Sequence, residues 1–182
     1  MANYLTLLRI FLIIPVLYLS TPEASLQNWL ALGLFIFAGV TDHLDGYIAR
    51  KTGSESTFGA LLDLVADKLL IIITITYFVS FASDLLLLLP SIVIVCREIV
   101  ISSIRQLLTQ KTGSNPIKVT FLAKSKTTLQ IFALSFLIIS PNFGEVFYVI
   151  TIFLFWLAAY VSLHSLYGYL NIYINLIKYQ NF

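Results

Sequence analysis

Long apolar runs separated by short polar segments constrain this chain more than any other feature. Several runs approach or exceed the roughly 20 residues that an α-helix needs to cross a bilayer. Charged residues make up only 11% of the sequence, whereas soluble domains carry roughly 25%. The sequence therefore predicts an all-α integral membrane protein, with residues 1–182 forming one domain. The single cysteine, Cys96, excludes an intrachain disulfide framework and a cysteine-cluster metal site.

Turn and capping residues divide the apolar runs into six predicted transmembrane helices. Polar segments that contain proline or glycine separate most of the runs, and Ser56 or Thr57 and Asn115-Pro116 are typical of helix starts. We expect helices at about residues 4–20, 27–50, 58–80, 85–110, 118–140 and 145–174.

The predicted loops differ in charge from one side of the membrane to the other. Glu23, Asp84 and Glu145 occupy alternate loops that contain no lysine or arginine. Every basic residue falls on the opposite side. Because Lys and Arg are enriched in cytoplasmic loops, we expect that side, with both termini, to face the cytoplasm.

Four aspartates interrupt the second and third apolar runs. An aspartate at the bilayer centre costs roughly 2.5–3.5 kcal/mol on insertion scales, and such residues usually mark function. Asp42 and Asp45 are three residues apart, and Asp63 and Asp67 four apart, so each pair lies on one face of its helix. At about 1.5 Å per residue, both pairs lie about 7–13 Å from the cytoplasmic ends of two antiparallel helices. We therefore expect the pairs to meet in the cytoplasmic half of the membrane.

The donor set favours a hard divalent cation. Carboxylate oxygens without histidine or cysteine ligands suit Mg²⁺ or Mn²⁺, and His43 is expected to face another side of the helix. Arg50 offers a planar donor fork that matches phosphate, or serves only as a cytoplasmic anchor. Gly46, Ala49 and Gly59 either admit a substrate to the metals or only allow close helix packing.

These residues alone suggest phosphoryl transfer on a lipid, with two metal ions between the carboxylate pairs. A cation or proton transporter is the alternative from another class. Transporters tend to place their sites at the membrane midplane between repeats, and this sequence has no evident repeat. A purely structural membrane module is a third interpretation, and it leaves the four aspartates unexplained.

The full motif extends over 26 positions, from 42 to 67. It reads Asp42-x-x-Asp45-Gly46-x-x-Ala49-Arg50, then eight residues, then Gly59-x-x-x-Asp63-x-x-x-Asp67. This motif resembles the signature of the CDP-alcohol phosphatidyltransferases, and the six predicted helices also resemble that family. The resemblance implies a homodimer in the membrane.

The resemblance also implies roles for the motif residues. Two divalent ions would bind the diphosphate of a CDP-linked lipid. Asp67 would act in addition as the general base for the acceptor hydroxyl. The ligands would be Asp42, Asp45 and Asp63 for one ion and Asp42, Asp63 and Asp67 for the other, with Gly46, Arg50, Ser56 and Gly59 at the CDP portion.

A second basic set lies farther along the chain, near the cytoplasmic ends of the fourth and fifth predicted helices. These residues are either membrane anchors or ligands for an acceptor that carries a phosphate. Arg97 follows an apolar run and needs a partner, but we expect the adjacent Glu98 to point to another side of the helix. The set is Arg97, Arg105, Lys124 and Lys126.

The segments around this basic set are similar to the phosphatidylglycerophosphate synthases within that family. The similarity implies CDP-diacylglycerol as donor, sn-glycerol 3-phosphate as acceptor and a bacterial cytoplasmic membrane as location. Serine or inositol phosphate is the alternative acceptor, and no nucleic-acid partner is expected. The start of the chain, Asn3-x-Leu5-Thr6-x-x-Arg9, also resembles the family, although Ala2 and Ala123 replace the proline and glycine usual there.

Overall fold

The computed structural model describes residues 2–52, 57–112 and 121–180, and within these ranges the chain is helical with no β-strand. The expected helices are confirmed there, whereas the expected caps at Ser56 and at Asn115-Pro116 lie outside the described residues. The elements are α1 (Ala2–Leu19), α2 (Leu26–Thr52), α3 (Thr57–Ala82), α4 (Leu85–Thr112), α5 (Phe121–Ile139), the 3₁₀ turn η1 (Ser140–Asn142) and α6 (Glu145–Gln180).

The last helix is longer than expected. α6 continues to Gln180, past the expected end at about residue 174, because no proline or glycine follows Gly168 to stop it. The turn before α6 contains Gly144 at a φ of 80°. Glycine adopts this left-handed conformation without steric cost, so the chain can reverse between η1 and α6.

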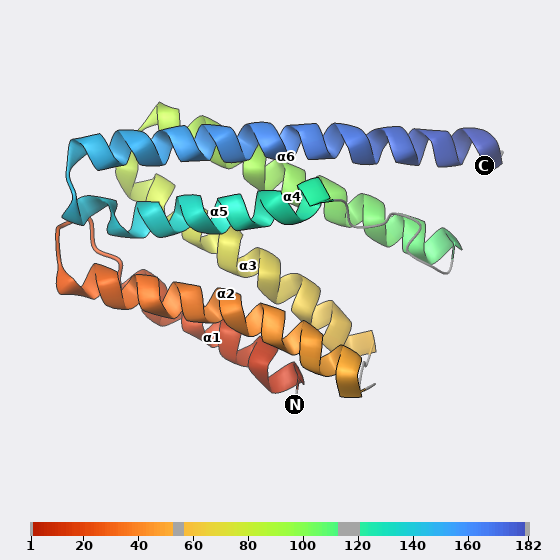
Figure 1. The fold of residues 1–182 in the computed structure, drawn as a ribbon, viewed down its shortest axis with the longest axis horizontal. Helices are drawn as coiled ribbons and strands as arrows, with labels where there is room; N and C mark the ends of the chain where they lie inside the picture. Colours follow the sequence, from red (N-terminus) through yellow and green to blue (C-terminus); the bar gives the residue numbers. More distant parts are fainter. Residues whose placement is uncertain (1, 53–56, 113–120, 181–182) are drawn as a thin grey trace.

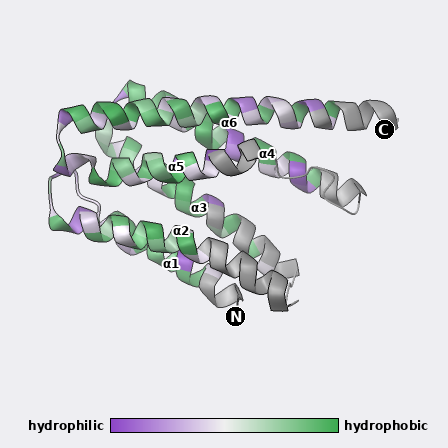
Figure 2. Ribbon diagram, viewed as in Figure 1, coloured by the Kyte–Doolittle hydropathy of each residue, from purple (hydrophilic) through white to green (hydrophobic). Residues whose placement is uncertain are grey.

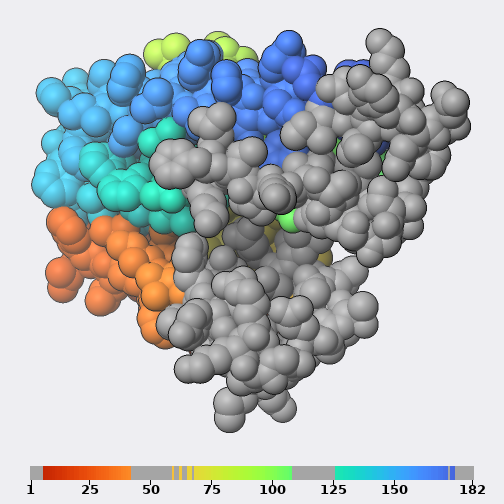
Figure 3. Space-filling model, turned by 45° about the vertical axis from the view of Figure 1, so that its right-hand side comes forward, coloured from red at the N-terminus to blue at the C-terminus, as the bar shows by residue number. Residues whose placement is uncertain are grey.

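The helices form two groups joined by α5 (Figure 1). α1 packs against α2 and α3, and α6 packs against α4 and α5. α5 also contacts α2 and α3, and on the face shown in Figure 3 it lies between α6 and α2. Each helix contributes to one apolar core, for example through Val16, Phe35, Ile75, Ile94, Leu134 and Phe155.

The outer surface carries many apolar side chains. Large side chains such as Ile14, Phe153 and Tyr160 are exposed, and Figure 2 shows hydrophobic residues along much of α6. Within the described residues, the segments Leu85–Leu107 and Glu145–Asn171 are long and apolar enough to cross a bilayer. The fold is therefore compatible with an all-helical membrane protein.

Asn28 joins the α1–α2 loop to η1 at the end of the bundle that carries Glu23, Asp84 and Glu145. Its side chain is fully buried. It accepts a hydrogen bond from the backbone N–H of Thr21 and donates to the carbonyl of Glu23, both at 2.8 Å. It also donates to Oδ1 of Asn142 at 2.8 Å, and Asn142 in turn donates to the carbonyl of Ser25 at 2.9 Å. The α1–α2 loop is thus fastened to η1.

We expect Asn28→Ala to destabilise the protein by about 2 kcal/mol, because it removes partly buried hydrogen bonds to Thr21, Glu23 and Asn142, each worth about 0.5–1.5 kcal/mol. The measurement is the thermal unfolding midpoint of the purified protein in detergent micelles, with Gln27→Ala as the control because Gln27 is exposed. Equal midpoints for the two variants would show that the asparagine bridge contributes no stability.

Candidate functional site

The aspartate motif lies at the facing ends of α2 and α3. The backbones of its four aspartates are helical, two in the second half of α2 and two in the first half of α3. The two helices are joined by the four residues 53–56, so Thr52 and Thr57 lie at most about 19 Å apart. The structure does not describe the side chains of the aspartates or of Arg50, and Ser56 lies outside the described residues altogether.

The register of α2 places its aspartates in line with a buried stripe. Phe35, Ala38 and Thr41 are all buried, at 1%, 0% and 3% exposure. Asp42 is seven residues from Phe35, and Asp45 is seven from Ala38 and four from Thr41. Residues four or seven apart share a helix face. The first half of the motif is therefore in helical register with the buried stripe of α2.

The aspartates of α3 are also in helical register with buried residues. Ala66, Leu70 and Thr74 are buried. Asp63 precedes Ala66 by three residues and Leu70 by seven, while Asp67 precedes Leu70 by three and Thr74 by seven. Both aspartate pairs are thus in helical register with buried residues, and α1 contacts both of their helices.

α1 contributes two buried polar side chains to this part of the bundle. Thr6 is 2% exposed and Arg9 is 1% exposed. Their burial follows from the packing of α1 against both α2 and α3. Asn3, the other residue of the N-terminal motif, has an undescribed side chain. Gly59 is partly buried, and Gly46 lies in the helical part of α2.

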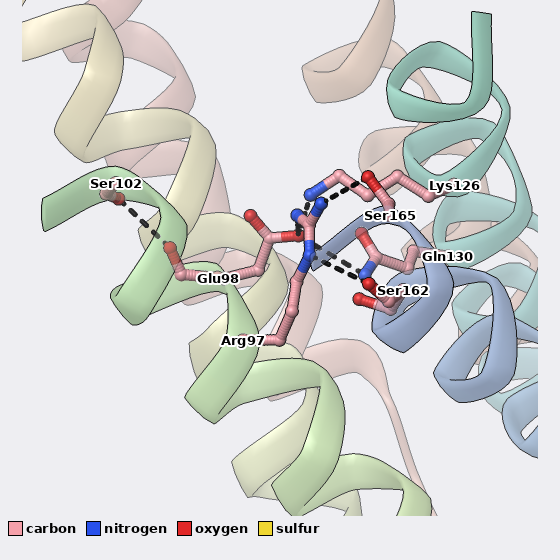
Figure 4. A network of polar contacts seen from close by, with 7 residues as sticks. All are labelled: Arg97, Glu98, Ser102, Lys126, Gln130, Ser162 and Ser165. Atoms are coloured by element: carbon pink, nitrogen blue, oxygen red, sulfur yellow. Dashed lines mark hydrogen bonds and ion pairs between the residues drawn. The ribbon is translucent and has the colours of Figure 1, made fainter. Parts of the chain in front are cut away.

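A separate polar network crosses the apolar core between α4, α5 and α6 (Figure 4). Arg97 on α4 is 2% exposed. Its Nε donates to the carbonyl of Ser162 at 3.1 Å, and its Nη2 donates to Oγ of Ser165 at 2.8 Å. Its Nη1 donates to Oε1 of Glu98 at 3.2 Å. The guanidinium therefore joins α4 to α6.

Glu98 is the centre of this network, and our expectation that it points away from Arg97 is wrong. The two side chains are long enough to meet although their Cα atoms are adjacent on the helix. Oε1 of Glu98 also accepts from Nζ of Lys126 and, at 3.4 Å, from Nε2 of Gln130. Both partners lie on α5. Glu98 thus links α4 to α5, and Arg97 extends the network to α6.

The structure brings two of the four predicted acceptor-site residues together. Arg97 and Lys126 share the same carboxylate oxygen. Arg105 is partly buried and lies eight residues beyond Arg97 on α4, about 12 Å along the helix axis. The side chain of Lys124 is not described.

Sequence reasoning missed the partners of these cations. Ser162 and Ser165 are three residues apart in an apolar helix, and both are buried. Two small hydroxyl residues at that spacing share a helix face. That spacing is the signal that the sequence offers for these partners.

Two further observations concern metal-binding groups and a cavity elsewhere in the molecule. Among the described side chains, no three His, Cys, Asp or Glu residues gather closely enough to hold a metal ion, and the four aspartates are not in that set. A cavity of about 410 Å³ is lined by Tyr77, Phe81 and Tyr148 among others. It lies at the opposite end of α3 from Asp63 and Asp67 and is therefore not the site formed by the motif.

Comparison with known proteins places the motif in a family context. Residues 1–163 match the family described as CDP-alcohol phosphatidyltransferase. A CDP-diacylglycerol–glycerol-3-phosphate 3-phosphatidyltransferase of Rickettsia bellii is 37% identical, over 92% of this chain and 91% of the relative. A protein of the same name from Rickettsia felis is 38% identical over 92% of this chain and 91% of the relative. One from Haemophilus influenzae is 33% identical over 93% of this chain and 90% of the relative.

Proposed function

This chain belongs to the CDP-alcohol phosphatidyltransferase family, and we propose from that premise that it transfers the phosphatidyl group of CDP-diacylglycerol to sn-glycerol 3-phosphate. The products are phosphatidylglycerophosphate and CMP. The observation that carries the proposal is the complete aspartate motif, whose two halves are in helical register with buried residues near the joined ends of α2 and α3. The names of the bacterial relatives support this donor and this acceptor.

The transfer makes one phosphorus–oxygen bond and breaks another. The acceptor hydroxyl oxygen attacks the lipid-side phosphorus of the diphosphate, and the bond from that phosphorus to the CMP oxygen breaks. The hydroxyl proton passes to the carboxylate of Asp67, the general base. CMP leaves with the electron pair of the broken bond.

Asp42, Asp45, Asp63 and Asp67 present only oxygen donors, which fits two Mg²⁺ or Mn²⁺ ions. We assign Asp42, Asp45 and Asp63 to one ion and Asp42, Asp63 and Asp67 to the other. When bound, the ions supply positive charge to the diphosphate and compensate the cost of four carboxylates in an apolar bundle.

Residues between the aspartates bind the donor nucleotide in this proposal. Gly46 and Gly59 have no side chain and leave room for the CDP portion beside the helices. Arg50 provides a forked donor for phosphate, and Ser56 provides a hydroxyl. α1 contributes Asn3, Thr6 and Arg9 to this site in our proposal. Thr6 and Arg9 are buried, and α1 packs against α2 and α3.

The second basic set binds the acceptor phosphate. Arg97 and Lys126 supply two cations that converge on one point, and Arg105 and Lys124 extend the positive set toward the membrane surface. An acceptor that carries a phosphate matches this charge. Serine lacks that phosphate, and inositol phosphate is bulkier; both remain the alternatives. A cation or proton transporter is the alternative from another class.

We place the protein in a bacterial cytoplasmic membrane as a homodimer with six spans. The relatives are bacterial. Glu23, Asp84 and Glu145 lie at one end of the helices, and the basic residues lie toward the other. The positive-inside rule then puts both termini and the reaction site on the cytoplasmic side.

Purified protein with CDP-diacylglycerol and Mg²⁺ is expected to release CMP when sn-glycerol 3-phosphate is added, and not with serine or inositol phosphate. Chelation with EDTA should stop the release, and Mn²⁺ or Mg²⁺ should restore it. The measurement is CMP by chromatography. If folded protein releases no CMP with any acceptor, the proposed activity is wrong.

Asp67→Asn is expected to lower the rate of CMP release at least about 10³-fold, because an amide cannot accept the proton and general-base catalysis contributes about 10²–10⁴-fold. Asp84→Asn is the matched control. Oδ1 of Asp84 accepts from the N–H of Leu86 at 2.8 Å, and asparagine can make the same helix cap. The control should retain activity. A fully active Asp67→Asn enzyme would rule out Asp67 as the base.

A further inference from the structure

The carboxylate of Glu98 occupies the point where two cations of the acceptor set converge. Oε1 of Glu98 accepts from Nη1 of Arg97 at 3.2 Å and from Nζ of Lys126. An anion that binds both cations at once needs an oxygen at this place. The protein itself supplies that oxygen (Figure 4).

The position of Arg97 is fixed independently of Glu98. Nε and Nη2 of its guanidinium donate to Ser162 and Ser165 on α6. Its Nη1 then points at Glu98. The guanidinium therefore stays in place when the carboxylate moves, and its Nη1 becomes open to another anion.

Exposure orders the three charged side chains from the core outward. The side chain of Arg97 is 1% exposed, that of Lys126 is 9% exposed and that of Glu98 is 14% exposed. Glu98 is thus the most accessible member of the group and the one that can leave with the least rearrangement.

The network also contains polar atoms that its present partners do not satisfy. Within the described residues, Oε1 of Gln130 and Oγ of Ser162 are buried and have no hydrogen-bond partner. Gln130 is 1% exposed and Ser162 is 0% exposed. Buried polar groups are normally paired, so the network is incomplete as it stands. A polyol phosphate brings hydroxyl groups that can donate to the amide oxygen of Gln130.

We propose that Glu98 is an internal anion that holds the acceptor-phosphate site until the acceptor displaces it. This inference rests on the proposed function, in which Arg97 and Lys126 bind the acceptor phosphate. A phosphate monoester carries a charge of about −1.5 to −2 near pH 7 and three strong acceptor oxygens, so it replaces a single carboxylate. A neutral alcohol or a zwitterion without phosphate does not. Glu98 is therefore a residue that determines acceptor specificity.

The test compares Glu98→Gln with the wild-type protein. Glutamine keeps the size of the side chain and removes its charge, so the acceptor phosphate no longer competes with a carboxylate. We expect the KM for sn-glycerol 3-phosphate to fall about tenfold, equivalent to about 1.4 kcal/mol of binding free energy. The KM for CDP-diacylglycerol should not change. Inorganic phosphate, used as a competitive inhibitor of the acceptor, should bind more tightly by a similar factor.

Glu23→Gln is the matched control, because its side chain is exposed in the α1–α2 loop and the substitution removes the same charge. Its kinetic constants should equal those of the wild type. A Glu98→Gln enzyme with an unchanged or higher acceptor KM would overturn the internal-anion proposal. If the wild-type protein itself releases no CMP with sn-glycerol 3-phosphate, the proposed function has failed instead.

A second readout separates this role from simple stabilisation. Glu98→Gln leaves two cations without their carboxylate, so 50 mM phosphate should raise its thermal unfolding midpoint more than it raises that of the wild type, relative to chloride at equal ionic strength. Glu98→Asp, whose shorter side chain withdraws from Lys126, should shift both readouts in the same direction. An equal phosphate effect in all three proteins would contradict the proposal.

Discussion

Charged groups inside an apolar helix bundle must have partners, and this constraint shapes the molecule. A buried charge without a partner costs several kcal/mol, so each buried charge requires compensation. In the α4–α5–α6 core the compensation is internal: Glu98 accepts from Arg97, Lys126 and Gln130 on two helices. Near the joined ends of α2 and α3, four aspartates are in helical register with buried residues, and we propose that divalent ions compensate them. The charge of Glu98 is compensated within the protein, whereas in this proposal the charges of the aspartates depend on bound metals.

In the function that we propose, the two halves of the reaction belong to different helix pairs. The motif for the donor is on α2 and α3, with buried polar side chains from α1 beside it. The cations for the acceptor are on α4 and α5 and are tied to α6. α5 contacts α2, α3 and α6 and so connects the two groups. A carboxylate that occupies the acceptor site before binding adds a reason for phosphate selectivity that charge matching alone does not give.

The sequence was sufficient for features that depend on local spacing. The six helices follow from apolar runs and turn residues, and the shared faces of Asp42 with Asp45 and Asp63 with Asp67 follow from the helical period. The Glu98 network could not be predicted in the same way. Adjacent residues point in different directions on a helix, so Arg97 and Glu98 appeared separate, and the pairing of Glu98 with Lys126 spans 28 residues of sequence. The burial of Arg9 likewise depends on how α1 packs, which its own sequence does not specify.

The central claim is that the acceptor hydroxyl attacks the lipid-side phosphorus directly, and oxygen labelling tests it most directly. The reaction is run with sn-glycerol 3-phosphate labelled with ¹⁸O in its C1 hydroxyl, and both products are analysed by mass spectrometry. The account predicts that the label is retained in phosphatidylglycerophosphate and is absent from CMP. Label in CMP, or solvent oxygen in the lipid product, would contradict it.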